Sequence, residues 1–143
     1  MTERVFTFVK PRHSQLYEGI FKHLDYHGKR IVTRVVPKAP RRLVEEHYAE
    51  HLGKRHYKTT VNGIADRIIV IGLYEGNVDN FRNLIGYGDP SKANLGTVRN
   101  RFSKDSYERA ALEGREVWNV IHCSDSVPAA EREISIWREF LKI

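Results

Sequence analysis

A dense polar cluster lies near the end of the chain at residues 119–126 (NVIHCSDS), between a short apolar stretch and a helical pattern. The imidazole of His122 is largely neutral at pH 7, so it could act as a nucleophile, a base or a metal ligand. Glu133 falls in the second or third turn of the following helix, where it could bond one ring nitrogen and fix the tautomer. The alternative is that the polar residues after His122 only cap the helix and that His122 is a satisfied rim residue.

Basic side chains that suit phosphate binding are dispersed along the chain at Lys10, Arg82, Arg99 and Arg101. Arginine offers a bidentate fork that matches phosphate oxygens, and it often serves this purpose in loops. Taken singly, each of these residues is better explained as a solvated surface charge.

Two histidines, His47 and His51, have the i, i+4 spacing of metal ligands on a helix. The residue after His47 is Tyr48 rather than the glutamate of the zinc-protease arrangement, and Cys123 is the sole thiol that could join them. A metal-dependent hydrolase is therefore the most remote interpretation. The sequence also holds no glycine-rich phosphate loop of the Walker type.

The elements that must position these residues alternate along the chain. Apolar, β-branched runs predict four strands, at Val5–Val9, Ile31–Val36, Arg67–Tyr74 and Val117–Ile121. Helical spacing and capping residues predict helices from Ser14 to about His27, from about Pro40 to Leu52, after Asn77 and after Ser126. We expect a long loop over Gly86–Ser103 and one or two helical turns over Ser106–Glu116, while Lys54–Asn62 is ambiguous. This order fits a doubly wound parallel sheet or an antiparallel sheet with helices on one face, and periodicity does not choose between them.

Length and composition indicate one globular domain over residues 1–143, with 41% hydrophobic and 29% charged residues. No apolar run approaches the roughly 20 residues that span a bilayer, so we expect no membrane association. A single cysteine and no secretory signal favour a cytoplasmic location. The net charge of +6 should attract polyanions, without separating nucleotides from nucleic acids or acidic lipids, but charge alone is better explained by a solvated basic surface.

The polar cluster carries a family resemblance. Residues 119–127 (NVIHCSDSV), followed by 130–134 (AEREI), resemble the active-site motif of nucleoside diphosphate kinases, N-x-x-H-x-S-D-S and then A-E-x-E-I. Lys10-Pro11, residues 46–51 (EHYAEH) and residues 96–99 (GTVR) agree with the same family in order and approximate spacing. The resemblance extends over nearly the whole chain.

This resemblance implies an α+β fold with a ferredoxin-like βαββαβ core, in which helices cover a four-stranded antiparallel sheet. It implies a ping-pong reaction in which His122 takes the γ-phosphoryl of a nucleoside triphosphate and gives it to a nucleoside diphosphate. Mg2+ is implied as the cofactor that bridges the phosphates, with few or no protein ligands, so we assign no metal-binding residue. Family members are usually hexamers, tetramers or dimers, which implies a homo-oligomer.

The resemblance also implies residue roles. Catalysis is assigned to His122, Glu133, Ser124, Lys10 and Tyr48. Nucleotide binding is assigned to Lys10, His56, Thr60, Arg82, Gly88, Arg99 and Asn119.

Departures from the family pattern fall around the base rather than on the reacting groups. His56 stands where the family has a base-stacking aromatic residue, and Thr60 stands in place of a leucine. Gly88 replaces a threonine that contacts phosphate, Arg101 replaces an acidic residue, and Ser103–Glu116 is about ten residues longer than in the commonest members. We therefore predict an active kinase with altered or weakened nucleotide affinity. The competing hypothesis is a non-catalytic module on the same fold that binds nucleotides or, weakly, nucleic acid.

Overall fold

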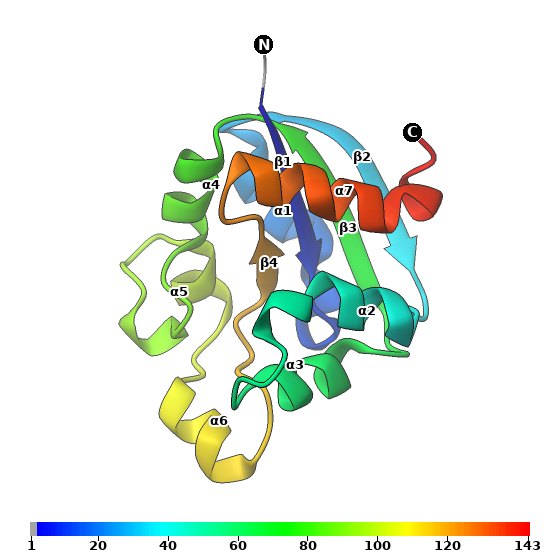
Figure 1. Ribbon diagram of the computed structural model, residues 1–143. Helices are drawn as coiled ribbons and strands as arrows, with labels where there is room; N and C mark the ends of the chain where they lie inside the picture. Colours follow the sequence, from blue (N-terminus) through cyan, green and yellow to red (C-terminus); the bar gives the residue numbers. More distant parts are fainter. Residues whose placement is uncertain (1–2) are drawn as a thin grey trace.

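A four-stranded antiparallel sheet organises the chain, with strand order β2-β3-β1-β4 (Figure 1). The computed structural model describes residues 3–143. Its strands are β1 (Arg4–Val9), β2 (Lys29–Val36), β3 (Ile69–Glu75) and β4 (Ile121–Cys123). This antiparallel order confirms the ferredoxin-like α+β fold and excludes the parallel alternative.

Helices cover both faces of the sheet, because apolar side chains of the central strands point alternately to the two sides. Phe6 and Phe8 of β1 pack in one core with α2 (Arg41–His47), α3 (Tyr57–Ile64) and α7 (Val127–Leu141). Val5 and Val9 pack in the other core with α1 (Tyr17–Asp25) and α4 (Val78–Ile85). Strand β1 is thus buried on both faces like β3.

Two helix starts agree with the expected capping residues. The side chain of Asn77 accepts a hydrogen bond from the backbone N–H of Asn80, and Ser126 accepts one from Ala129. The predicted start at Ser14 is wrong, because Ser14 lies inside the 3-10 helix η1 (Pro11–Leu16) and donates its hydroxyl to the carbonyl of Pro11. Within residues 3–143, no helix has both the length and the apolar character that a membrane crossing requires.

Three further segments differ from the predicted boundaries. The helix expected over Pro40–Leu52 ends at His47, and His51 belongs to a separate 3-10 helix, η2 (Ala49–His51). The ambiguous stretch Lys54–Asn62 contributes most of α3. The loop expected over Gly86–Ser103 contains η3 (Pro90–Lys92) and α5 (Val98–Phe102), which Thr97 caps.

The last strand is displaced from its predicted position. It covers Ile121–Cys123 rather than Val117–Ile121, so His122 lies within the strand and pairs with Phe8 of β1. The reason is Val120, which has φ of 79°, a conformation that a β-branched residue rarely adopts and that interrupts a strand. Its carbonyl accepts a hydrogen bond from the backbone N–H of Lys10 at 2.9 Å, so this turn ties the strand ends together.

The segment before β4 forms α6 (Tyr107–Glu113), as the helical turns expected there predict, with Ser106 as its cap. Asp105 anchors its base: its carboxylate accepts hydrogen bonds from Arg115 Nη1 at 2.7 Å and Nη2 at 3.0 Å. The same carboxylate accepts one from the backbone N–H of Trp118 at 2.8 Å. The segment therefore has a fixed geometry relative to β4.

Candidate active site

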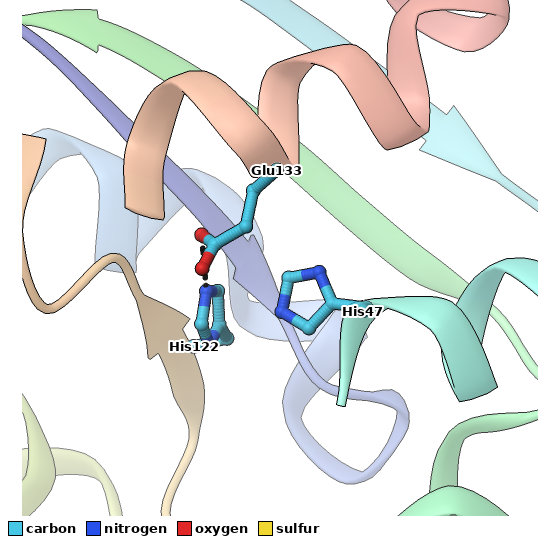
Figure 2. Close-up of side chains that lie close together, drawn as sticks. All are labelled: His47, His122 and Glu133. Atoms are coloured by element: carbon cyan, nitrogen blue, oxygen red, sulfur yellow. Dashed lines mark hydrogen bonds and ion pairs between the residues drawn. The ribbon is translucent and has the colours of Figure 1, made fainter. Parts of the chain in front are cut away.

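His122 and Glu133 form the centre of the site. Strand β4 presents the imidazole, helix α7 presents the carboxylate, and Nε2 of His122 lies 2.8 Å from Oε1 of Glu133 (Figure 2). The same Oε1 is 2.9 Å from the hydroxyl of Ser124, which is fully buried behind it. Because an ionised carboxylate only accepts, Nε2 carries the proton and Nδ1 of His122 keeps its lone pair.

The surroundings of His122 keep it neutral. Burial, with the positive charges of Lys10 and Arg99 nearby, lowers the pKa of His122 to about 3. Its ring stacks on Phe8, with 5.1 Å between centroids and 26° between planes, which fixes the ring plane. A neutral, oriented imidazole with a free lone pair is a nucleophile at physiological pH.

A second histidine, His47 of α2, lies against the first. The two rings are 4.3 Å apart at 81°, and Figure 2 shows one nitrogen of His47 on the side of His122. Its Nδ1 accepts a hydrogen bond from the indole of Trp137 at 3.1 Å, while its buried Nε2 has no partner within residues 3–143. Burial and the nearby His122 lower the pKa of His47 well below its usual value.

The only cluster of three ligand-type side chains within residues 3–143 is His47, His122 and Glu133, whose ligand atoms lie within 4.8 Å of one another. His51 is outside this cluster, because α2 ends at His47 and the two residues do not share one helix face. Since indole can only donate, neutral His47 carries its proton on Nε2, and this nitrogen presents an N–H rather than a lone pair. The cluster therefore lacks a complete set of metal-binding lone pairs.

An open hollow of about 910 Å³ lies in front of His122. Its lining includes Glu133, Tyr48, Arg82, Gly88 and Arg99, all residues assigned from sequence. Tyr48 has its hydroxyl buried without a hydrogen-bond partner within residues 3–143, and burial raises its pKa. The hollow thus combines a nucleophile with positive charge.

Arg99 has a structural function in this hollow. Its guanidinium donates to three backbone carbonyls, those of Gly86, Asn119 and Ile121, at 2.7–3.0 Å. These bonds join the end of α4 to β4 and, within residues 3–143, leave two of its five N–H groups for a ligand. Arg82 reaches the carbonyl of Asp125 at 3.3 Å and is otherwise exposed.

A second hollow of about 730 Å³ adjoins the first and shares Tyr48, His51 and Tyr107 with it. It contains the remaining residues assigned from sequence, Lys10, His56, Thr60 and Asn119. Lys10 Nζ donates to Asn119 Oδ1 at 2.8 Å, and burial lowers its pKa to about 8. The structure thus brings every assigned site residue into these two hollows, except Ser124 behind Glu133.

Sequence patterns did not identify several residues that lie next to the site. His47 was considered only as a candidate metal ligand, and Trp137 was not assigned to the site. Tyr107 carried no signal, because nothing local places α6 over the site. Glu116 lines the second hollow with its Oε2 buried and unpartnered within residues 3–143, and burial raises its pKa.

Comparison with known proteins places these observations in a family. The family model for nucleoside diphosphate kinase matches residues 3–142. A nucleoside diphosphate kinase of Corynebacterium diphtheriae is 37% identical over 142 residues, which cover 96% of this chain and 97% of that protein. One of Saccharomyces cerevisiae is 36% identical over 140 residues, which cover 95% of this chain and 85% of that protein.

Solved structures agree with this assignment. An NDP kinase of Pyrobaculum aerophilum superposes with a TM-score of 0.85 at 26% identity, covering 99% of both chains. The enzyme of Borrelia burgdorferi, solved as a transition state mimic with vanadate and ADP, gives a TM-score of 0.88 at 23% identity. That match covers 94% of this chain and 86% of the other, and it shows the shared fold.

Fold and site together define a ferredoxin-like α+β protein with a half-buried, neutral histidine facing a polar hollow that Arg82 and Arg99 help to line. The chain belongs to the nucleoside diphosphate kinase family. Membership confirms the family and the enzyme class, a phosphotransferase acting as a kinase, that the motif around His122 predicted.

Proposed function

We propose that this protein transfers the γ-phosphoryl group of a nucleoside triphosphate to a nucleoside diphosphate through a phosphohistidine on His122. The observation that carries this proposal is the 2.8 Å bond from Nε2 of His122 to Glu133, because it leaves the lone pair of Nδ1 free. The enzyme then alternates between a free and a phosphorylated form, which is ping-pong kinetics.

Each half of the reaction is a displacement at phosphorus. Nδ1 attacks the γ-phosphorus, the P–N bond forms, and the bond to the bridging oxygen breaks, so its electron pair leaves with the diphosphate. The phosphorylated imidazole keeps its proton on Nε2 and is cationic, and the carboxylate of Glu133 stabilises that charge. A terminal oxygen of a second diphosphate then attacks the phosphorus, and the electron pair of the P–N bond returns to Nδ1.

Positive groups in the two hollows hold the phosphates. Lys10, Arg82 and the two unused N–H groups of Arg99 neutralise charge on the oxygens of the transferred group. Phosphoryl transfer requires mainly such positioning and charge stabilisation from the protein. Asn119 and Thr60 lie in the second hollow with His56, where the nucleoside would extend from the phosphates.

Magnesium enters this scheme as part of the nucleotide. Mg2+ prefers oxygen ligands and retains water, so the phosphates supply its main ligands. The first hollow offers the carboxylates of Glu50, Asp79 and Asp125 for its outer hydration shell, whereas the His47, His122 and Glu133 cluster offers mainly nitrogen. When bound, the ion neutralises phosphate charge and orients the γ-phosphoryl group.

The decisive experiment is incubation with γ-labelled ATP and magnesium in the absence of an acceptor. We expect an acid-labile, base-stable label that any nucleoside diphosphate removes, and we expect His122→Ala to carry none. His27→Ala, which changes an exposed histidine, is the matched control and should be labelled normally. A folded wild-type protein that takes no label would disprove the proposed reaction.

A further inference from the structure

Tyr107 reaches the site from helix α6. Its side chain lines both the hollow in front of His122 and the adjoining hollow with Lys10 and Asn119. A nucleotide that extends from one hollow into the other must therefore pass this side chain.

The hydroxyl of Tyr107 occupies the space above Gly88. A Cβ atom built on Gly88 would overlap this oxygen, so no residue with a side chain fits there while Tyr107 keeps its position. Gly88 is not among the residues with positive φ, so the backbone itself does not demand glycine. The glycine is thus explained by the tyrosine hydroxyl.

The position of this hydroxyl suits a phosphate oxygen. The charge of Arg99 acts on Tyr107, opposing the effect of burial, which raises the pKa of the phenol. The phenol is protonated at neutral pH and can donate. Asn119 donates to the carbonyl of Gly88 at 3.1 Å and accepts from Lys10, which joins this wall to the cationic groups.

We propose that Tyr107 is a substrate-binding residue whose hydroxyl donates a hydrogen bond to a phosphate oxygen of the bound nucleotide, from the place that a side chain at residue 88 would otherwise occupy. This inference rests on the proposed function, because it uses the nucleotide orientation given above. It assigns a direct binding function to helix α6.

The test measures nucleotide binding at equilibrium, so that it does not depend on turnover. Tyr107→Phe removes only the hydroxyl, and we expect it to weaken ADP binding about tenfold, the lower end for a hydrogen bond to a charged group, since the ring is half exposed. Binding of adenosine, which lacks phosphate, should not change. Tyr26→Phe, an exposed tyrosine at the end of α1, is the control.

A rescue variant tests the position of the hydroxyl. Tyr107→Ala should bind ADP more weakly than the wild type, and adding Gly88→Thr should restore part of the affinity, because a threonine hydroxyl enters the vacated space. Wild-type ADP affinity in Tyr107→Phe, or no gain from Gly88→Thr, would overturn the inference. Phosphorylation of His122 is measured in a separate assay. A wild-type protein that takes no label would disprove the proposed reaction, and the ADP affinity of the Tyr107 variants would still test the contact between Tyr107 and phosphate.

Discussion

Trp137 donates a hydrogen bond from its indole nitrogen to Nδ1 of His47 at 3.1 Å, and both side chains are almost wholly buried. Because the indole nitrogen only donates, this bond decides which nitrogen of His47 is protonated. The N–H of His47 consequently lies on Nε2, on the side of His122 (Figure 2). Trp137, a residue of the hydrophobic core, thus determines that His47 presents an N–H group rather than a lone pair on the side of His122.

Replacing this donor tests that relationship. Trp137→Phe leaves Nδ1 of His47 buried without a partner, and we expect the free energy of unfolding to fall by about 1–3 kcal/mol from this cause, in addition to the packing loss. Urea denaturation measures the change, and the nitrogen-15 shifts of the imidazole report the tautomer. A wild-type spectrum with the proton on Nδ1 would contradict the assignment.

Neutralising Glu133 should slow phosphorylation without preventing it. Glu133→Gln keeps an oxygen that can accept from Nε2 of His122 but removes the charge that stabilises the cationic phosphohistidine. A hydrogen bond to a charged group contributes about 1.5–3 kcal/mol, so we expect the labelling rate to fall by about ten- to a hundredfold. Rapid-quench labelling measures it, and Glu139→Gln on the exposed side of α7 is the control that should retain the wild-type rate.

The pH dependence of kcat/KM should be asymmetric. Burial lowers the pKa of Lys10 to about 8, so its charge and its contribution to phosphate binding decline above that pH. The pKa of His122 is lowered to about 3, so the nucleophile stays unprotonated well into the acid range. We expect a plateau at neutral and mildly acid pH and a fall above pH about 8. Lys10→Arg should remove that alkaline fall, and its persistence in the variant would assign it to another group.

The free energy of unfolding should decline toward acid pH, because two histidines of the site have lowered pKa values. The pKa values of His122 and His47 lie below the unfolded value near 6.5, so below that pH the unfolded chain binds protons that the folded chain does not. The free energy of unfolding should therefore fall from pH about 6.5 downward, by up to about 1.4 kcal/mol per pH unit for each histidine. Urea titrations at several pH values should show a smaller fall for His47→Asn than for the control His27→Asn, and equal falls would refute this cause.

The sequence predicts a contact in this site only where the two residues that form it are close together in the chain. His122, Ser124 and Glu133 lie in one short segment, so their motif identified them together. The start of β4 was misplaced because Val120 has an apolar, strand-forming side chain but a backbone conformation that ends the strand. The tautomer of His47 depends on Trp137 in another helix, and Gly88 depends on Tyr107, and no local pattern reports either contact.

Asp105, which anchors the base of α6, offers one more test of the second hollow. The hydrogen bonds from Arg115 hold the pKa of Asp105 at about 2, so this carboxylate is ionised above acid pH and contributes stability that disappears as the pH falls through that range. Asp105→Asn should cost about 1–3 kcal/mol and loosen Tyr107, raising KM for nucleotides more than it lowers kcat. Steady-state kinetics and thermal unfolding measure both effects. Glu108→Gln, an exposed position on α6, should change neither quantity, and an unaltered KM in Asp105→Asn would show that α6 does not need this anchor.

The nucleophile and its carboxylate partner come from one continuous piece of chain, β4 and α7, whereas α3 and α6 wall the adjoining hollow. Substitutions or changes of length in α6 can therefore alter which nucleotides fit while the 2.8 Å contact between His122 and Glu133 persists. In evolutionary terms, the reaction is inherited with one segment and nucleotide affinity can diversify through another. The same separation gives protein engineers a surface helix to exchange when they want a kinase of this family with a different nucleotide affinity.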